Sequence, residues 1–444
     1  MSWPTRITHV NMTQMIPVDQ LAVGMYVAQL DRPWLETPFL FQGFYIRDDD
    51  EISELKAHCR HVYVTRETLP ADMQPNTRVV TGGAETATPR KEESSRRRFG
   101  LKGLLGLFKA SKSEDGLGTS TVIYQPSASL KEEMPAASGV HQRASAIVNG
   151  VMDKVRQSGN LEIKSLQAAV TPMVDSVLRN PAALACLMRL QKTDNYLYQH
   201  SIASSVWATI LGRQLGLDRK DLDVIALGAM VLDVGKTQVP REVLTKPTEL
   251  TDSERALMHR HIQFGLEILE RSGNVDPAVL EMVAHHHERH NGTGYPAGLS
   301  GNEIPVFGRI AGIVDTYDAM ITSRPYATQM SNYHALRQLR VLADVEFQAE
   351  IVEQFTRAVG VFPTGTLVEL NTGEVAVVTK QNAIRRLRPE VMVIMDANKA
   401  LLDDFRVVNL DKETVASSDR HSLWIETGLA PGTYGIDPTE FYLN

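Results

Sequence analysis

The stretch on which our interpretation turns reads His285-His286-His287-Glu288-Arg289-His290-Asn291-Gly292-Thr293-Gly294-Tyr295-Pro296. Neutral imidazole is the commonest metal ligand in proteins, and three adjacent imidazoles are hard to explain as packing. The glycines permit a sharp turn after them, and the proline fixes the exit from that turn. We therefore predict one wall of a metal site with a loop that faces a ligand. The alternative is a polar helix end followed by an ordinary loop.

Working outward, the residues from 141 to 360 have apolar positions spaced as in amphipathic helices. The helical period is followed by two sets of residues: Ile202, Val206, Ile210 and Leu215, and then Leu222, Ile225, Ala226, Ala229 and Met230. Strand-like segments are negligible in this range. The pattern predicts an all-α domain of six to eight helices.

Two smaller modules flank this helical domain. Residues 1–75 combine strand-like segments, such as 61–65, with a short helix at 52–59, which predicts an α+β accessory or regulatory module. Residues 361–444 contain a hairpin signal, Asn371-Thr372-Gly373, between two strand-like runs, which predicts a β-rich appendage. The predicted fold class is therefore multidomain and mainly α.

Residues 76–140 differ from both neighbours and are interpreted as a flexible basic linker. They contain small-residue stretches typical of linkers. Within them, residues 96–109 are basic and apolar together, without an acidic residue. A solvated linker is favoured there. The alternatives are weak contact with an anionic membrane surface and docking on a partner protein.

The composition limits the functional classes. The chain has 444 residues, 43% of them hydrophobic, and a formal net charge of −7, which does not suggest binding to duplex nucleic acid. The two cysteines are far apart in sequence, which argues against a disulfide framework or a thiolate zinc cluster. The N-terminus has no apolar signal core, and no apolar run is long enough to span a membrane. We expect a cytoplasmic bacterial protein, either wholly soluble or peripheral at the inner membrane.

Further histidines and acids border apolar helical stretches, at positions where their side chains could point inward. They are His200, Asp233, His261 and Asp315. A buried Asp or His is costly unless it is paired or bound to a metal. Together these residues form a set suited to one or two divalent transition metals, and a carboxylate such as Asp233 can bridge two ions.

The order of these motifs resembles that of the HD-GYP family. The matching blocks are His200, Asp233-Val234-Gly235-Lys236, His261, His286-His287-Glu288-Arg289, Gly292-Thr293-Gly294-Tyr295-Pro296, Asp315-Thr316-Tyr317-Asp318-Ala319 and Arg324-Pro325-Tyr326. The resemblance covers residues 141–360. It implies an HD-type phosphohydrolase that cleaves cyclic di-GMP to pGpG or GMP with two or three metal ions, often iron or manganese.

The resemblance also implies roles for single residues. The implied metal ligands are His200, Asp233, His261, His286, His287 and Asp315, with Asp233 bridging two ions. Lys236 would act beside Asp233 as a cationic stabiliser of the scissile phosphate or its leaving oxygen. Arg324 would contact a ligand phosphate through its guanidinium fork. Gly294, Tyr295 and Pro296 would shape the substrate-binding loop, where Tyr295 would stack on or hydrogen-bond to the ligand.

Three positions depart from the family pattern. Leu232 stands where the family has the histidine of its His-Asp pair, so one metal ligand is replaced by a side chain that cannot coordinate. Tyr196 stands four residues before His200, where three-metal members carry a Glu. Ala327 replaces a residue that is often basic. We therefore expect two metal ions, with the ion held by His200, Asp233 and Asp315 bound more weakly than the other.

Two functions from different classes stay open at this point. The first is a metal-dependent cyclic di-GMP phosphodiesterase in bacterial second-messenger signalling, which the nearly complete ligand set favours. The second is a catalytically impaired domain that acts as a cyclic di-GMP receptor or a protein-interaction module, which Leu232 favours. A third reading, hydrolysis of another phosphodiester, is disfavoured by the Gly-Tyr-Pro loop. Expected partners are cyclic di-GMP, signalling proteins such as diguanylate cyclase domains, and a second copy of the chain.

Overall fold

The structure of the chain is a computed structural model. The structure describes residues 14–23, 25–31, 44–46, 49–65, 122–190, 196–322, 329–382, 385–412, 423–437 and 441. The chain divides into two compact units, Ser2–Glu114 and Asp115–Asn444, and each is described by itself. The basic segment 96–109 and the predicted phosphate-binding Arg324 lie outside the described residues. None of the described helices is long and apolar enough to cross a membrane.

The N-terminal unit is a small antiparallel sheet with one helix. Its strands are β1 (Gln14–Pro17), β2 (Tyr26–Leu30), β3 (Phe44–Tyr45) and β4 (His61–Thr65), in the order β1-β4-β2-β3. Helix α1 (Asp49–His58) supplies Ile52 and Leu55 to a core that also contains Val27, Val62 and Val64. The predicted α+β module is confirmed, because the alternating apolar residues of β2 and β4 need a helix to cover them.

The second unit begins with a long helix. Helix α3 (Leu130–Ser158) starts at a capping box, in which Ser129 accepts from the backbone N–H of Glu132 and the Glu132 side chain accepts from that of Ser129. It ends at Gly159, whose φ of 69° lies in the left-handed region. The helical part therefore starts at Leu130, ahead of residue 141, where the sequence analysis places it.

Twelve α-helices occur among the described residues of this unit, more than the six to eight expected. After α3 they are α4 (Ile163–Arg179), α5 (Pro181–Leu190), α6 (Tyr196–Leu215), α7 (Arg219–Val231), α8 (Arg241–Leu244), α9 (Asp252–His259), α10 (His261–Ser272), α11 (Pro277–His285), α12 (Val306–Ile321), α13 (Asn332–Val341) and α14 (Ala349–Val359). The excess comes from short helices between α7 and α12, where capped turns divide the chain. The mainly helical fold class is confirmed.

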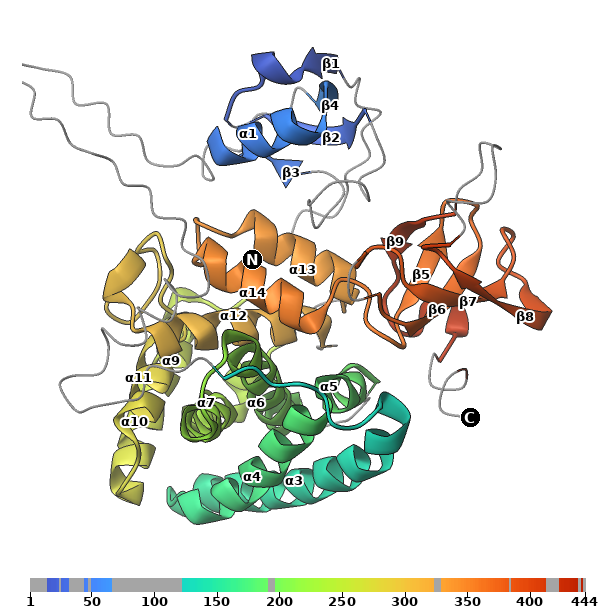
Figure 1. The fold of residues 1–444 in the computed structure, drawn as a ribbon. Coiled ribbons are helices and arrows are strands. Elements are labelled where there is room, and N and C mark those ends of the chain that lie inside the picture. The colour runs from blue at the N-terminus through green and yellow to red at the C-terminus, as the bar shows by residue number, and fades with distance from the viewer. Residues whose placement is uncertain are drawn as a thin grey trace, which may run out of the picture. The chain divides into compact units, whose positions relative to one another are not determined.

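Helices α6 and α7 lie at the centre of the helical part. Helix α6 packs against α3, α4, α7, α12 and α14, and its Trp207 is fully buried. Figure 1 shows α6 and α7 surrounded by the other helices. Because α6 is buried on nearly all sides, its sequence is apolar or small nearly all round. A polar residue such as His200 on this helix is therefore held inside the protein.

The C-terminal part is a five-stranded antiparallel sheet in the order β8-β7-β6-β5-β9. Its strands are β5 (Leu367–Leu370), β6 (Val375–Lys380), β7 (Glu390–Met395), β8 (Leu401–Asn409) and β9 (Ile425–Gly428). The predicted β5–β6 hairpin is present, with Gly373 at a φ of 82° in its turn.

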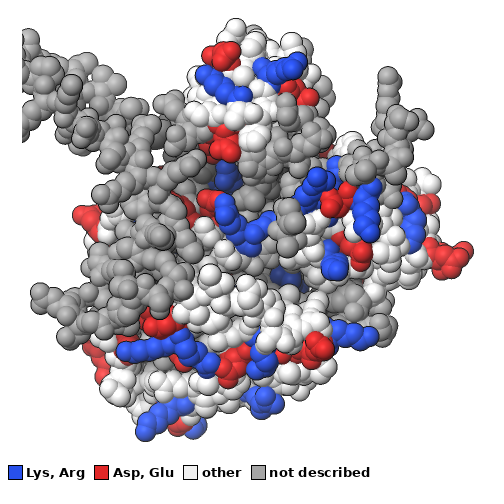
Figure 2. Space-filling view, in the orientation of Figure 1, with Lys and Arg blue, Asp and Glu red and all other residues white. Residues whose placement is uncertain are grey.

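Figure 2 shows one face of the molecule. Acidic and basic side chains are interspersed over this face, and neither sign forms a large patch of its own in that view.

Candidate metal centre

The six predicted ligands come from five segments of the helical part and converge in its interior. His200 lies on α6, Asp233 follows α7, His261 is the first residue of α10, His286 and His287 follow α11, and Asp315 lies on α12. His200, Asp233, His261 and His286 are at most 2% exposed. Their ligand atoms form two groups that could each hold a metal ion: Asp233 with His261, His286 and His287, and Asp233 with His200 and Asp315.

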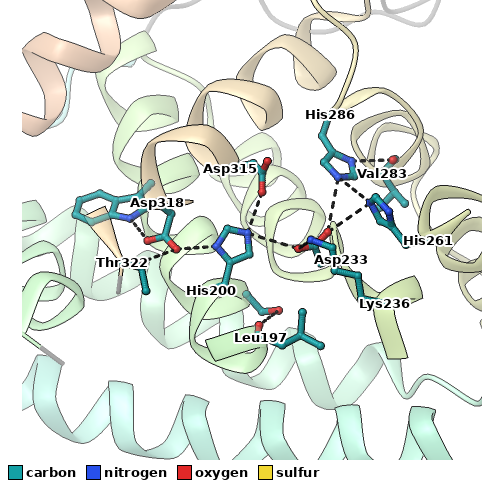
Figure 3. Close-up of polar contacts among 12 residues, drawn as sticks. Leu197, His200, Asp233, Lys236, His261, Val283, His286, Asp315, Asp318 and Thr322 are labelled. Carbon is teal, nitrogen blue, oxygen red and sulfur yellow. Dashed lines mark hydrogen bonds and ion pairs between the residues drawn. The ribbon is translucent and has the colours of Figure 1, made fainter. Parts of the chain in front are cut away.

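Asp233 belongs to both groups and directs one carboxylate oxygen into each. Its Oδ1 lies 3.5 Å from His261 Nε2 and 3.8 Å from His286 Nε2. Its Oδ2 lies 3.6 Å from His200 Nε2, on the other side. Figure 3 shows Asp233 between these imidazoles. The buried Oδ1 atom has no hydrogen-bond partner. A buried, unpaired carboxylate oxygen is costly, so this arrangement fits a carboxylate that bridges two cations.

Backbone carbonyls fix the tautomers of two histidines. His261 Nδ1 lies 2.7 Å from the carbonyl oxygen of Met258, and His286 Nδ1 lies 2.9 Å from that of Val283. A carbonyl only accepts, so each Nδ1 must carry the proton and donate it. The lone pair of each neutral ring is then on Nε2, which faces Asp233. This is the arrangement in which a histidine binds a metal through one nitrogen and is oriented through the other.

His200 is oriented by a carboxylate instead. Its Nδ1 donates to Asp318 Oδ2 at 2.7 Å, and Asp318 Oδ1 accepts from the indole N–H of Trp207 at 3.0 Å. Its Nε2 lies 2.9 Å from Asp315 Oδ1. Asp318 is 1% exposed and Trp207 is fully buried, so the chain of contacts is shielded from water. The sequence analysis includes Asp318 in a block that matches the family, without a ligand role, and it does not include Trp207.

The histidines of the two ligand groups have their pKa values shifted in opposite directions. Burial disfavours a charged His200, but the carboxylates of Asp315 and Asp318 outweigh it and raise the pKa of His200 to about 9. Burial, with a further contribution from the charge of Lys236, lowers the pKa of His261 to about 4. Burial also lowers the pKa values of His286 and His287. The imidazoles of His261, His286 and His287 are therefore neutral at pH 7, as a metal ligand requires.

Lys236 is the one cation that the described structure places in contact with the ligand set. It lies in the 3-10 turn Val234–Gln238, and its Nζ is 2.5 Å from Asp233 Oδ2. The side chain is 21% exposed, so its ammonium group lies between the buried carboxylate and the solvent. Burial would raise the pKa of Asp233, but Lys236 and the neighbouring imidazoles outweigh it and lower that pKa. Asp233 is therefore an anion at neutral pH.

The glycine-tyrosine-proline loop packs directly on a predicted ligand. The ring of Tyr295 stacks on His287, with centroids 4.7 Å apart, and on His259 at 3.8 Å from its other face. A Cβ at Gly294 would lie 2.4–2.5 Å from backbone atoms of residues 287–289, so only glycine allows this close approach. Tyr295 therefore supports His287, a role that the sequence analysis did not foresee. His259 is exposed to solvent and stacks on Tyr295.

A buried carboxylate anchors the other side of this loop. Glu288 is 4% exposed, and its two oxygens accept from the backbone N–H groups of Ala297 at 2.8 Å and Leu299 at 3.0 Å. Pro296, between these contacts and Tyr295, is exposed to solvent. The loop is thus fixed at both ends while its proline faces outward.

Three glycines let the ligand-bearing segments approach one another. A Cβ at Gly235 would lie 1.9 Å from the carbonyl oxygen of His261, and one at Gly312 would lie 2.9 Å from that of His286. A Cβ at Gly308 would lie 2.8 Å from the Cβ of His285. These close approaches bring the turn after α7 onto α10, and α12 onto the end of α11. These glycines are visible in the sequence, and the close approach of these segments could have been predicted from them.

Two of the three departures from the family pattern lie among the described residues. Leu232 caps the end of α7 and is 1% exposed, directly before Asp233. Tyr196 is the first residue of α6. Ala327, like Arg324, lies outside the described residues. The group of His200, Asp233 and Asp315 therefore offers three ligands, and the other group offers four.

Comparisons with known proteins identify related sequences over most of the chain. The chain matches the family described as HD domain over residues 185–351, a domain of unknown function over residues 13–166, and the KOW domain associated with HD domain over residues 367–416. The HD domain match contains all six predicted metal ligands. The KOW match covers strands β5 to β8 of the C-terminal sheet.

Three relatives illustrate the similarity. The chain is 30% identical over 407 residues to a cyclic di-GMP phosphodiesterase of Pseudomonas aeruginosa, covering 90% of each protein. It is 36% identical over 151 residues to the cyclic di-GMP phosphodiesterase response regulator RpfG of Xanthomonas campestris, covering 34% of this chain and 40% of that protein. It is 35% identical over 144 residues to the 3'3'-cGAMP-specific phosphodiesterase 2 of Vibrio cholerae, covering 32% of this chain and 28% of that protein. The first similarity spans nearly the whole chain.

Proposed function

The chain belongs to the HD-GYP family of phosphodiesterases, and from this premise we propose that it hydrolyses cyclic di-GMP at a centre of two divalent metal ions. The observation that carries the proposal is the position of Asp233, which has one oxygen in each of two ligand groups. A domain that only bound a nucleotide would have no need of a buried carboxylate shared in this way.

The donor set supports divalent transition metals. The four-ligand group is Asp233, His261, His286 and His287, and the three-ligand group is His200, Asp233 and Asp315. Mixed imidazole and carboxylate ligands suit iron, manganese and zinc. From the family resemblance we propose iron or manganese, one ion for each group. The missing ligand at Leu232 leaves the three-ligand group as the weaker of the two.

The chain's own residues would divide the work of hydrolysis. Bound ions supply Lewis acidity toward the phosphate and a more acidic water. Lys236 would donate to a phosphate oxygen or to the departing 3′ oxygen as negative charge develops there. The oxygen of water forms the new bond to phosphorus, the bond from phosphorus to the 3′ oxygen breaks, and a proton passes to that oxygen. One such step gives linear pGpG, and a second gives GMP.

The substrate loop and the remaining roles follow from the resemblance. Gly294, Tyr295 and Pro296 would form the loop at the mouth of the site, with Pro296 exposed toward the ligand. Arg324 would contact a ligand phosphate. Relatives are named for cyclic di-GMP and for 3'3'-cGAMP, so we propose a cyclic dinucleotide as the substrate class and cyclic di-GMP as its member. The divisions at residues 75 and 360 and the signalling partners stay part of the proposal.

A turnover assay with a matched control tests this proposal. The full chain is loaded with Mn²⁺ or Fe²⁺, and the conversion of cyclic di-GMP is followed by chromatography. We expect turnover that falls at least a hundredfold in Asp233→Asn, because that change removes the shared charge. His58→Gln, which changes a partly exposed histidine of the N-terminal unit, should act as the wild type does. Absence of turnover by the wild type with either metal would overturn the enzymatic proposal.

One observation favours a second function. Leu232 removes a ligand from the three-ligand group, so a chain that holds only one ion would bind the nucleotide without cleaving it. In that case cyclic di-GMP binding, measured by calorimetry, would persist without turnover, and the domain would act as a receptor.

A further inference from the structure

An exposed histidine outside the ligand set belongs to a stack of rings that ends on a predicted metal ligand. His259 is the last residue of α9, and its ring lies nearly parallel to that of Tyr295, with centroids 3.8 Å apart and 11° between the planes. Tyr295 in turn stacks on His287, with centroids 4.7 Å apart and 26° between the planes. One face of a tyrosine ring has no room for two such rings, so Tyr295 lies between the two histidines.

The position of His259 separates it from the metal site. Tyr295 stands between its ring and that of His287, so a whole aromatic ring lies between His259 and the four-ligand group. Neither of the two ligand groups formed by the described residues includes His259. Any effect of His259 on a bound ion is therefore transmitted through Tyr295.

The loop that carries Tyr295 has little buried surface to keep its shape. Most residues from 291 to 298 are exposed, and Gly292 and Gly298 have positive φ values of 77° and 68°. The backbone N–H of Tyr295 donates to the carbonyl oxygen of His287 at 3.2 Å, at the long end of the usual range. Segments with few buried apolar contacts open at low cost in free energy. The contact of Tyr295 with His259 opposes such an opening.

The outer end of the stack is fixed to the segment that carries another ligand. His261 follows His259 by two residues and is the first residue of α10. The carbonyl oxygen of Met258, the residue before His259, accepts from His261 Nδ1 at 2.7 Å. One turn of chain thus sends one imidazole toward Tyr295 and another toward the metal site. The stack joins the turn that orients His261 to the loop that follows His287.

We propose that His259 is a positioning residue that clamps Tyr295 against His287. The clamp holds the segments of the four-ligand group at their spacing before an ion binds. It depends on the stacking of an aromatic ring and needs neither ring nitrogen of His259, so another aromatic side chain can replace it and alanine cannot. The effect on metal binding rests on the proposed metal centre, whereas the clamp itself is present in the metal-free chain.

The clamp is tested first without metal. Hydrogen exchange of the loop that contains the Tyr295 backbone N–H is followed by mass spectrometry on the metal-free full chain. We expect exchange about three- to tenfold faster in His259→Ala, which is the size of effect that one aromatic pair gives. His259→Phe keeps the ring and should stay within about twofold of the wild type. Unchanged exchange in His259→Ala, or equally fast exchange in both variants, would overturn the clamp.

The effect on the metal centre is measured in an Asp315→Asn background. That change removes a ligand of the three-ligand group and leaves the four-ligand group complete. In a calorimetric Mn²⁺ titration, adding His259→Ala should weaken the remaining site by about threefold or more, and adding His259→Phe should change it by less than about twofold. An ion bound equally well with and without the ring would overturn this effect. No Mn²⁺ binding by the wild type would instead overturn the metal centre, and the exchange measurement would then decide the clamp alone.

The neighbouring residue Arg260 supplies the matched control. It is also exposed, and its guanidinium lies over the ring of Phe264, 4.7 Å from the centroid, rather than in the stack. Arg260→Ala should therefore leave both the exchange of the loop and the Mn²⁺ affinity within about twofold of the wild type. If Arg260→Ala reproduces the losses of His259→Ala, the turn as a whole and not the ring of His259 is responsible, and the proposal is refuted.

Discussion

Replacing Gly235 by alanine tests the close approach on which the metal centre depends. The added Cβ would lie 1.9 Å from the carbonyl oxygen of His261 and 2.5 Å from the backbone nitrogen of Gly265. Real Cβ contacts are essentially never below 3.0 Å, and both opposing atoms are backbone. The turn Val234–Gln238 must therefore move about 1 Å away from α10.

The magnitude follows from this displacement. Overpacking of a well-packed core costs about 1–3 kcal/mol, and here no flexible side chain can give way, so we expect the upper end, about 3 kcal/mol. The smaller entropy of the unfolded alanine chain returns less than about 1 kcal/mol. The same movement separates Asp233 from His261, and metal sites tolerate only about 0.2 Å. Metal affinity at the four-ligand group should fall at least tenfold.

The assay compares Gly235→Ala with a matched glycine. Gly150 lies on the exposed face of α3, and a Cβ there would meet nothing within 4 Å. Gly150→Ala should stabilise the protein by about 0.5–1 kcal/mol, because alanine is the better helix former. Urea unfolding of the metal-free chain gives the stability, and calorimetry with Mn²⁺ gives the affinity. If Gly235→Ala matches the wild type in both, the packing of the turn against α10 is wrong.

Three further predictions concern the His200 group. Asp318→Asn should weaken Mn²⁺ binding at the three-ligand site 10- to 100-fold in a calorimetric titration, because the carboxylate that orients His200 is lost; unchanged affinity would show that Asp318 does not position the ring. Leu232→His should tighten the same site and destabilise the metal-free chain, because a buried imidazole without a metal replaces a buried leucine; a weaker site would show that position 232 does not face the ion. In the metal-free chain the pKa of His200 is raised to about 9, so its stabilising contribution is complete below about pH 6.5 and is lost as the pH rises through 9; urea midpoints that stay flat from pH 6.5 to 9 would contradict this contribution.

The order of motifs along the chain selected six candidate ligands, and the structure brings their side chains together in two groups. His200, Asp233 and Asp315 are more than 30 residues apart from one another, so no local pattern could place them together. The family resemblance did so, and the grouping expected from it agrees with the grouping found in the structure. The periodic apolar residues of α6 and α7 predicted the helical core, because buried helices keep that signal.

The sequence analysis missed contacts that depend on tertiary packing. The contacts of Trp207 and Asp318 join α6 to α12, and their partnership is visible only once those helices pack together. The early start of α3 was foreseeable, since Ser129 and Glu132 have the spacing of a capping box. The role of Tyr295 could not be foreseen, because its stacking on His287 depends on how the loop folds back.

The central claim is that Asp233 joins two metal sites, and counting metal ions tests it most directly. The full chain and its Asp233→Asn and Asp315→Asn variants are dialysed against Mn²⁺, and bound metal is measured per chain. The account predicts about two ions in the wild type, about one in Asp315→Asn, and a loss at both sites in Asp233→Asn. One ion or none in the wild type, or two in Asp233→Asn, would contradict it.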